Sequence, residues 1–180
     1  MSDKKTLFDA IDAQRDVLCS MADQIFDHPE YEGEEVFASG LLTDYLRAQG
    51  FEVEMGVGGF KTAFRATYKR GEGGPKLGIL CEYDALRNLG HGCGHHMQGP
   101  GCLGAAVALK NMDGTEPFEL IVYGTPAEES FGSKVQMLEH GCFKELDVAF
   151  MMHGGPNTCT DVKCLAQKSF NVTFHGKRAH

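Results

Sequence analysis

Basic residues, long apolar runs and an export signal are scarce or missing in this sequence, and each absence excludes a class of protein. The 180 residues include 17 Lys and Arg against 25 Asp and Glu, which gives a net charge of −8. A nucleic-acid backbone or an anionic membrane surface requires a basic patch, and no segment forms one. No apolar run approaches the roughly 20 residues that a membrane span needs. We therefore expect neither nucleic acid nor membrane as a partner.

The sequence also has no recognisable disulfide framework. Its seven cysteines are an odd number, and their spacing follows no regular scheme. Residues 1–16, MSDKKTLFDAIDAQRD, contain no apolar core followed by a small-residue cleavage site, as a secretory signal would. We therefore expect reduced thiols and a cytoplasmic protein.

Three short apolar runs, KLGILCEY, FELIVYG and DVAFMMH, indicate strands that are covered on both faces. They are nearly continuous rather than alternating, which is typical of parallel strands joined by crossover helices. Two more strands are expected at Phe51–Met55 and Thr62–Tyr68, with KRGEGGPK after them as a solvated hairpin turn. Helices are expected over residues 5–27, Glu34–Gln49, Met97–Asn111 and Ser133–His140. The pattern predicts an α/β layered domain with a mostly parallel central sheet flanked by helices.

The C-terminal residues follow a different pattern. In KSFNVTFHGK, Phe170, Val172 and Phe174 alternate with polar residues, which predicts a half-exposed strand. The preceding GGPNTCTD has no apolar periodicity. We therefore divide the chain into a first domain, residues 1–157, and the start of a second, residues 158–180.

Ionisable residues follow the carboxyl ends of all three apolar runs. The first run ends at Glu82 and is followed by Asp84; Glu128 and Glu129 follow the second, and His153 ends the third. Ligands of open α/β sheets bind beyond the carboxyl ends of the strands. Parallel strands would therefore bring these residues to one rim of the sheet.

The segment GHGCGHHMQGPG, residues 90–101, belongs to the same rim because it lies between the first apolar run and the next helix. Cys93 and His95 are two residues apart, so in an extended segment their side chains point the same way. Alone, such a pair in a glycine-rich turn is more often structural than functional. Beside the carboxylates and His153, it indicates a transition metal held by sulfur, nitrogen and oxygen, with zinc favoured and manganese as the alternative.

The adjacent carboxylates Glu128 and Glu129 suggest a division of roles. Glu129 could bind a metal while Glu128 acts as a general base toward water whose pKa the metal lowers to roughly 7. The alternative is that the pair only interacts with a helix dipole, and that Asp84 only caps a turn. The functional interpretation predicts metal-assisted hydrolysis.

Taken in order, EYDAL, HGCGHH, TPAEES, DVAFMMH and GKRAH resemble the M20 metallopeptidases, and within them the aminobenzoyl-glutamate hydrolase and aminoacylase-like amidohydrolase branch. The resemblance implies a zinc-peptidase-like catalytic domain in residues 1–157 and the first strands of an inserted α+β lid or dimerisation domain in residues 158–180. It implies hydrolysis of the amide bond of an N-acyl or N-aroyl amino acid or a dipeptide. It also implies two divalent metal ions, zinc or manganese, and a homodimer in the full-length form.

The resemblance assigns roles residue by residue. It implies four metal ligands, which are Cys93, His95, Glu129 and His153. It implies Glu128 as the general base and Asp84 as a carboxylate that orients a ligand. It also implies that His180 contacts the substrate. His96 departs from the pattern, because the branch usually has Asp or Asn there.

Family members are much longer than this chain, so we expect an N-terminal piece of the enzyme with little or no hydrolase activity alone. Two alternatives stay open. One is a non-catalytic remnant that keeps the fold and binds metal only in part. The other is a hydrolase that uses Cys93 as its nucleophile with a nearby histidine.

Overall fold

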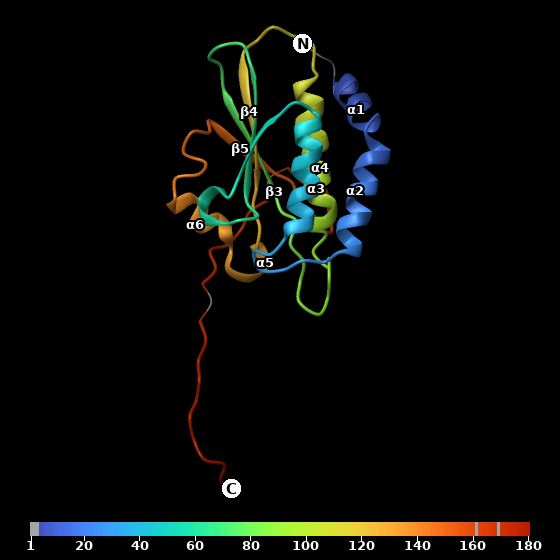
Figure 1. Ribbon diagram of the computed structural model, residues 1–180. Helices are drawn as coiled ribbons and strands as arrows, with labels where there is room; N and C mark the ends of the chain where they lie inside the picture. Colours follow the sequence, from blue (N-terminus) through green and yellow to red (C-terminus); the bar gives the residue numbers. More distant parts are fainter. Residues whose placement is uncertain (1–3, 161, 169) are drawn as a thin grey trace.

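A five-stranded sheet forms the centre of the protein (Figure 1). The computed structural model describes residues 4–160, 162–168 and 170–180. In the order in which they lie in the sheet, the strands are β1 (Glu52–Met55), β2 (Phe64–Arg70), β4 (Phe118–Gly124), β3 (Lys76–Cys81) and β5 (Val148–Met151). β2 pairs antiparallel with both β1 and β4, whereas β3 pairs parallel with β4 and β5. Only β2 therefore runs against the others, which confirms the predicted α/β fold with a mostly parallel sheet.

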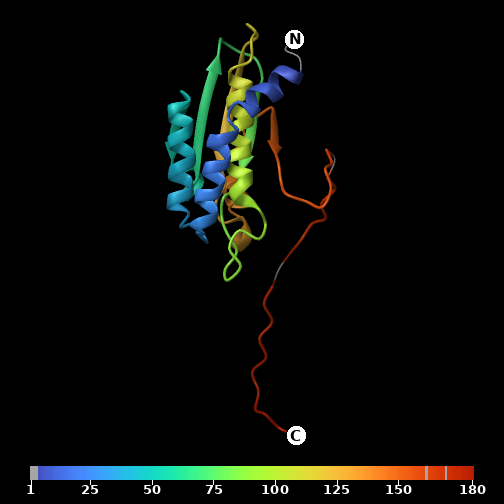
Figure 2. The same ribbon diagram turned by 90° about the vertical axis from the view of Figure 1, so that its right-hand side faces the viewer.

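Helices cover both faces of this sheet. The first face carries α1 (Lys4–Asp12), α2 (Arg15–Asp27), α3 (Val36–Ala48) and α4 (His95–Lys110), which lie side by side in Figure 2. On the other face lies α6 (Ser133–Glu139), preceded by the one-turn helix α5 (Glu128–Phe131). Alternate residues of β4 supply both cores: Leu120 and Val122 pack with the first layer, and Ile121 and Tyr123 with Met137 of α6. None of the described helices is long and apolar enough to cross a bilayer.

The predicted single helix over residues 5–27 is wrong, because the chain breaks between α1 and α2. Gln14 lies at the break and is bonded to three elements. Its Nε2 donates to the carbonyls of Ala10, at 2.8 Å, and Gly104 of α4, at 3.3 Å. Its Oε1 accepts from the hydroxyl of Tyr45 of α3 at 2.6 Å. These tertiary bonds hold a bend that the apolar periodicity of the segment does not reveal.

The predicted hairpin turn at KRGEGGPK is also wrong. β4 lies between β2 and β3, so the strands on either side of this segment are not paired with each other. The segment instead passes the start of β4, where Glu119 donates its N–H to the carbonyl of Pro75 at 3.0 Å.

The C-terminal part of the chain is more exposed than predicted. β5 is an edge strand, and Phe150 in its middle is 59% exposed, although the apolar run predicts a strand covered on both faces. Among the described residues after Met151, none belongs to a helix or strand, so the predicted strand around Val172 does not form. These residues form an extended tail (Figure 2), in which an isolated strand has no partner for its backbone groups. The domain boundary at residue 157 stays a prediction.

Candidate metal centre

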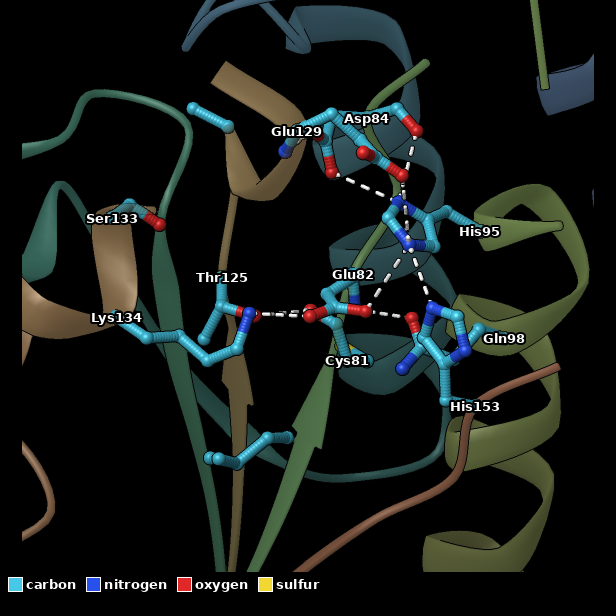
Figure 3. A network of polar contacts seen from close by, with 12 residues as sticks. Cys81, Glu82, Asp84, His95, Gln98, Thr125, Glu129, Ser133, Lys134 and His153 are labelled. Atoms are coloured by element: carbon cyan, nitrogen blue, oxygen red, sulfur yellow. Dashed lines mark hydrogen bonds and ion pairs between the residues drawn. The ribbon is translucent and has the colours of Figure 1, made fainter. Parts of the chain in front are cut away.

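Residues from four separate segments meet at the carboxyl ends of the parallel strands (Figure 3). Asp84 follows β3, His95 begins α4, Glu129 lies in α5 after β4, and His153 follows β5. Figure 3 shows His95 in the middle, with Asp84 and Glu129 above it and Glu82 and His153 below it. The crossover topology thus places side chains that are far apart in sequence around one imidazole.

Asp84 orients two neighbours. His95, only 1% exposed, places its Nδ1 at 3.1 Å from both the backbone oxygen and Oδ1 of Asp84. The other carboxylate oxygen, Oδ2, accepts the backbone N–H of Glu129 at 2.9 Å. Because Nδ1 faces two acceptors, it carries the proton, and Nε2 of the neutral ring is left with a lone pair. Asp84 therefore fixes both the tautomer of His95 and the position of Glu129.

The lone pair of His95 faces other acceptors. Its Nε2 lies 3.3 Å from Nε2 of His153 and 3.8 Å from Oε1 of Glu129. His153 also has its Nδ1 on an acceptor, the carbonyl of Gly154 at 2.7 Å, so its Nε2 likewise presents a lone pair. Burial opposes a charge on His95, but the hydrogen bond to Asp84 and the charges of Glu82, Asp84 and Glu129 outweigh it and raise the pKa of His95. The cluster therefore attracts a cation, and its nitrogen and oxygen donors fit a divalent transition metal.

Glu128 and Cys93 lie at the border of this cluster. Single donor atoms of His95, Glu128 and Glu129 all lie within 4.8 Å of one another. Burial, together with the charge of Glu82, raises the pKa of Glu128. A hydrogen bond to Glu129, burial and the surrounding carboxylates raise the pKa of Cys93 to about 11. A thiol in such an environment stays protonated, which disfavours Cys93 as a nucleophile.

Two of the predicted or questioned residues lie elsewhere. His180 is in the exposed tail, which leads away from the cluster (Figure 1), so the structure does not bring it to the site. His96 packs against α2, with its ring centroid 5.0 Å from that of Phe26 and 5.2 Å from that of His91. His96 thus contributes to the contact between α4 and α2.

The sequence patterns assign no role to Glu82 or Gln98. Gln98 of α4 accepts the backbone N–H of Glu82 at 3.1 Å and donates to the carbonyl of Met152, and so joins the ends of β3 and β5. Glu82 is 1% exposed, and its Oε1 pairs with Lys134 of α6. The position of Glu82 at the end of an apolar run is a sequence signal that could have identified it, whereas no sequence pattern marks Gln98.

Glu35 is a third buried polar residue to which the sequence patterns give no role. Its Oε1 accepts the backbone N–H groups of Gly33, at 2.8 Å, and Ala127, at 3.2 Å, and its Oε2 lies 3.0 Å from the hydroxyl of Thr62. Burial raises the pKa of Glu35. Through Ala127, it supports the turn that precedes Glu128.

The protein is a layered α/β domain with carboxylates and imidazoles gathered at the strand ends, an arrangement typical of metal-dependent hydrolases. Residues 80–176 match the family model described as Peptidase family M20/M25/M40. The chain belongs to this family.

Three comparisons show how far the similarity extends. The chain is 34% identical to the mouse Xaa-Arg dipeptidase, over 98% of this chain and 44% of that protein. It is 36% identical to a subunit of the p-aminobenzoyl-glutamate hydrolase of Escherichia coli, over 96% of this chain and 40% of that protein. The fold matches the YXEP protein of Bacillus subtilis, described as a dinuclear metal-binding peptidase, with a TM-score of 0.66 at 24% identity, over 87% of this chain and 45% of that one. The chain thus spans less than half the length of the relatives it matches.

Proposed function

We propose that this chain carries the metal-binding and general-base part of an amidohydrolase that cleaves the amide bond of an N-acyl or N-aroyl amino acid or of a dipeptide. The observation that carries the proposal is the position of the His95 ring. Asp84 orients this ring, and His153, Glu128 and Glu129 lie around it. The names of the mouse and Escherichia coli relatives, a dipeptidase and an aroyl-glutamate hydrolase, support this substrate class.

The metals would be two divalent ions, zinc or alternatively manganese, held by Cys93, His95, Glu129 and His153. The description of the Bacillus subtilis neighbour as dinuclear supports this number. When bound, such a metal polarises the substrate carbonyl and makes water acidic enough to attack it at neutral pH. The ligand set combines thiol, imidazole and carboxylate groups, which suits zinc better than a purely oxygen-binding ion.

Glu128 is proposed as the general base. Its carboxylate takes a proton from the attacking water and afterwards delivers it to the nitrogen of the leaving amine. The raised pKa of Glu128 suits both steps, because a base that must also return the proton works best with a pKa near the working pH. Asp84 acts through His95, whose Nδ1 proton and ring orientation it fixes.

The substrate would enter beside Glu129. A cavity of about 410 Å³ lies there, lined by Tyr31, Glu32, Asp84, Arg87, Glu129 and their neighbours, and its size suits a small molecule. His180 is proposed to contact the substrate carboxylate or the developing oxyanion, and the full-length protein is proposed to be a homodimer. Both ideas rest on the family resemblance.

Metal analysis combined with an activity assay tests the proposal. We expect the metal-free chain to take up divalent zinc with defined stoichiometry, and we expect any release of p-aminobenzoate from p-aminobenzoyl-glutamate to be abolished by chelator. Glu128→Gln should abolish turnover without changing metal content, and the exposed Glu139→Gln should change neither. Zinc uptake without turnover would favour the non-catalytic remnant. Turnover that survives chelation and is lost on alkylation would favour the cysteine nucleophile.

A further inference from the structure

Glu82 is a charged side chain whose burial is energetically unfavourable. It is 1% exposed, and its Oε1 pairs with Lys134, but its Oε2 is buried and has no hydrogen-bond donor among the described residues. A buried carboxylate oxygen without a donor is destabilising unless a cation or another donor compensates it. Either a proton on Nε2 of His95, 3.3 Å away, or a bound cation would compensate Oε2.

The surroundings of this oxygen show what kind of ligand fits. Oε2 lies 3.3 Å from Nε2 of His95, and that atom lies 3.3 Å from Nε2 of His153. Both rings place their Nδ1 on acceptors, Asp84 and the carbonyl of Gly154, so both Nε2 atoms of the neutral rings present lone pairs. With both rings in this neutral form, three electron-pair donors face one another, as the ligands of one cation would.

The distances match a tetrahedral metal site. Zinc binds imidazole nitrogen and carboxylate oxygen at about 2.0–2.2 Å, so two ligand atoms on one tetrahedral ion are about 3.3–3.5 Å apart. The two measured separations of 3.3 Å fall at this value, and the three donor atoms together lie within 4.8 Å of one another. We propose that Glu82 is itself a metal ligand, which completes with His95 and His153 a three-residue site for a divalent transition metal. This inference rests on the proposed function and adds to its ligand set a residue that the family resemblance does not supply.

Two neighbours hold Glu82 in place for this role. Lys134 occupies Oε1, so that only Oε2 is left to bind the metal. Gln98 accepts the backbone N–H of Glu82 and donates to Met152, the residue before His153. The same amide thus fixes the spacing between two of the three ligands, and we assign it a positioning role.

The test is metal affinity, measured on the metal-free 180-residue chain by titration with Zn²⁺, together with the visible spectrum of the Co²⁺ form. Glu82→Gln should weaken the tighter Zn²⁺ site on the order of 100-fold or more, at or above the roughly 10- to 100-fold typical of a residue that only supports a ligand. It should also shift the Co²⁺ absorption bands, because a ligand atom changes. Lys134→Met, which removes the partner of Glu82 but leaves the carboxylate, should keep the Co²⁺ bands.

The outcomes are separable. If the wild-type chain takes up no Zn²⁺, the proposed function itself fails. If wild type binds Zn²⁺ and folded Glu82→Gln binds it equally with an unchanged Co²⁺ spectrum, only the role of Glu82 is overturned. Equal losses of affinity in Glu82→Gln and Lys134→Met, with unchanged spectra, would make the pair structural and would also overturn it. Circular dichroism checks that each variant folds. If Glu82→Gln does not fold, Glu82→Asp takes its place in the same test, because it keeps the charge but moves the carboxylate oxygen away from the proposed metal position.

Discussion

The carboxyl oxygen Oε1 of Glu35 accepts the backbone N–H of Ala127 at 3.2 Å, across 92 residues of sequence. Ala127 has a φ of 55°, in the left-handed region, which costs a non-glycine residue about 1–2 kcal/mol. It stands directly before Glu128 and Glu129. A buried side chain at the entrance to α3 thus helps to hold the strained turn that presents both candidate catalytic carboxylates.

Counting hydrogens at Glu35 predicts its protonation state. The hydroxyl of Thr62 has one hydrogen and two neighbours, the carbonyl of Gly33 at 3.2 Å and Oε2 of Glu35 at 3.0 Å. A neutral carboxylic acid satisfies all groups, because Oε2–H donates to Thr62, Thr62 donates to Gly33, and Oε1 accepts its two N–H groups. The raised pKa of Glu35 agrees with this arrangement.

The first prediction follows from that count. Glutamine mimics the neutral acid, since its amide N–H replaces the acid proton, so Glu35→Gln should change the free energy of unfolding by less than about 1 kcal/mol. Glu35→Ala leaves the N–H groups of Gly33 and Ala127 without an acceptor and should cost about 3 kcal/mol. Urea denaturation measures both, with the exposed Glu34→Ala as control. Equal losses in the Gln and Ala variants would contradict the neutral acid.

The second prediction concerns pH. Burial, with a smaller contribution from Asp84, raises the pKa of Glu35 above its ordinary value of 4.5, although the hydrogen bonds it accepts act in the opposite direction. A carboxyl group with a raised pKa in the folded state stabilises the fold below the pKa of the unfolded chain, and this stabilisation is lost as the pH rises through the folded pKa. Glutamine does not titrate. Glu35→Gln should therefore gain stability relative to wild type between about pH 4 and about pH 8, as measured by urea denaturation at both values. A constant or shrinking difference would refute the sign.

The third prediction tests Gln98 as the link between the ends of β3 and β5. Gln98→Glu replaces the N–H group that faces the carbonyl of Met152 with an oxygen, so two acceptors meet. We expect a loss of about 1–3 kcal/mol of stability and faster hydrogen exchange at the amides of β5, with Zn²⁺ affinity reduced because His153 is no longer held. The exposed Gln136→Glu makes the same chemical change on α6 and should leave exchange in β5 as it is. Unaltered exchange in both variants would remove the positioning role.

Much of the fold could be predicted because local patterns determine it. The continuous apolar runs located β3, β4 and β5, and strand direction alone placed Asp84, Glu129 and His153 at one rim. Contacts between distant segments could not be read in this way. The bend at Gln14 depends on α3 and α4, and the separation of β2 from β3 depends on the later insertion of β4 between them.

The same limit applies to the candidate site. Sequence spacing identified residues whose chemistry is visible in a motif, such as Cys93 and His95. The apolar run that ends at Glu82 is a signal of its burial, but no pattern marks Glu35 as buried, since an acidic residue in a sequence is exposed by default. The structure adds the decisive observations. Glu82 has a carboxylate oxygen without a donor, and Glu35 shares the hydroxyl hydrogen of Thr62 with the carbonyl of Gly33.

The last prediction tests whether Cys93 is an activated nucleophile. A hydrogen bond to Glu129, burial and nearby carboxylates raise the pKa of this thiol to about 11, from an ordinary value of 9.0. At neutral pH its thiolate fraction is then about 100-fold lower than that of an unperturbed cysteine. In the metal-free chain, iodoacetamide should therefore modify Cys93 far more slowly than the exposed Cys19, as followed by peptide mass spectrometry. Glu129→Gln should speed the reaction at Cys93 and leave Cys19 unchanged. Alkylation of Cys93 ahead of Cys19 would show an activated thiol and restore the cysteine-nucleophile hypothesis.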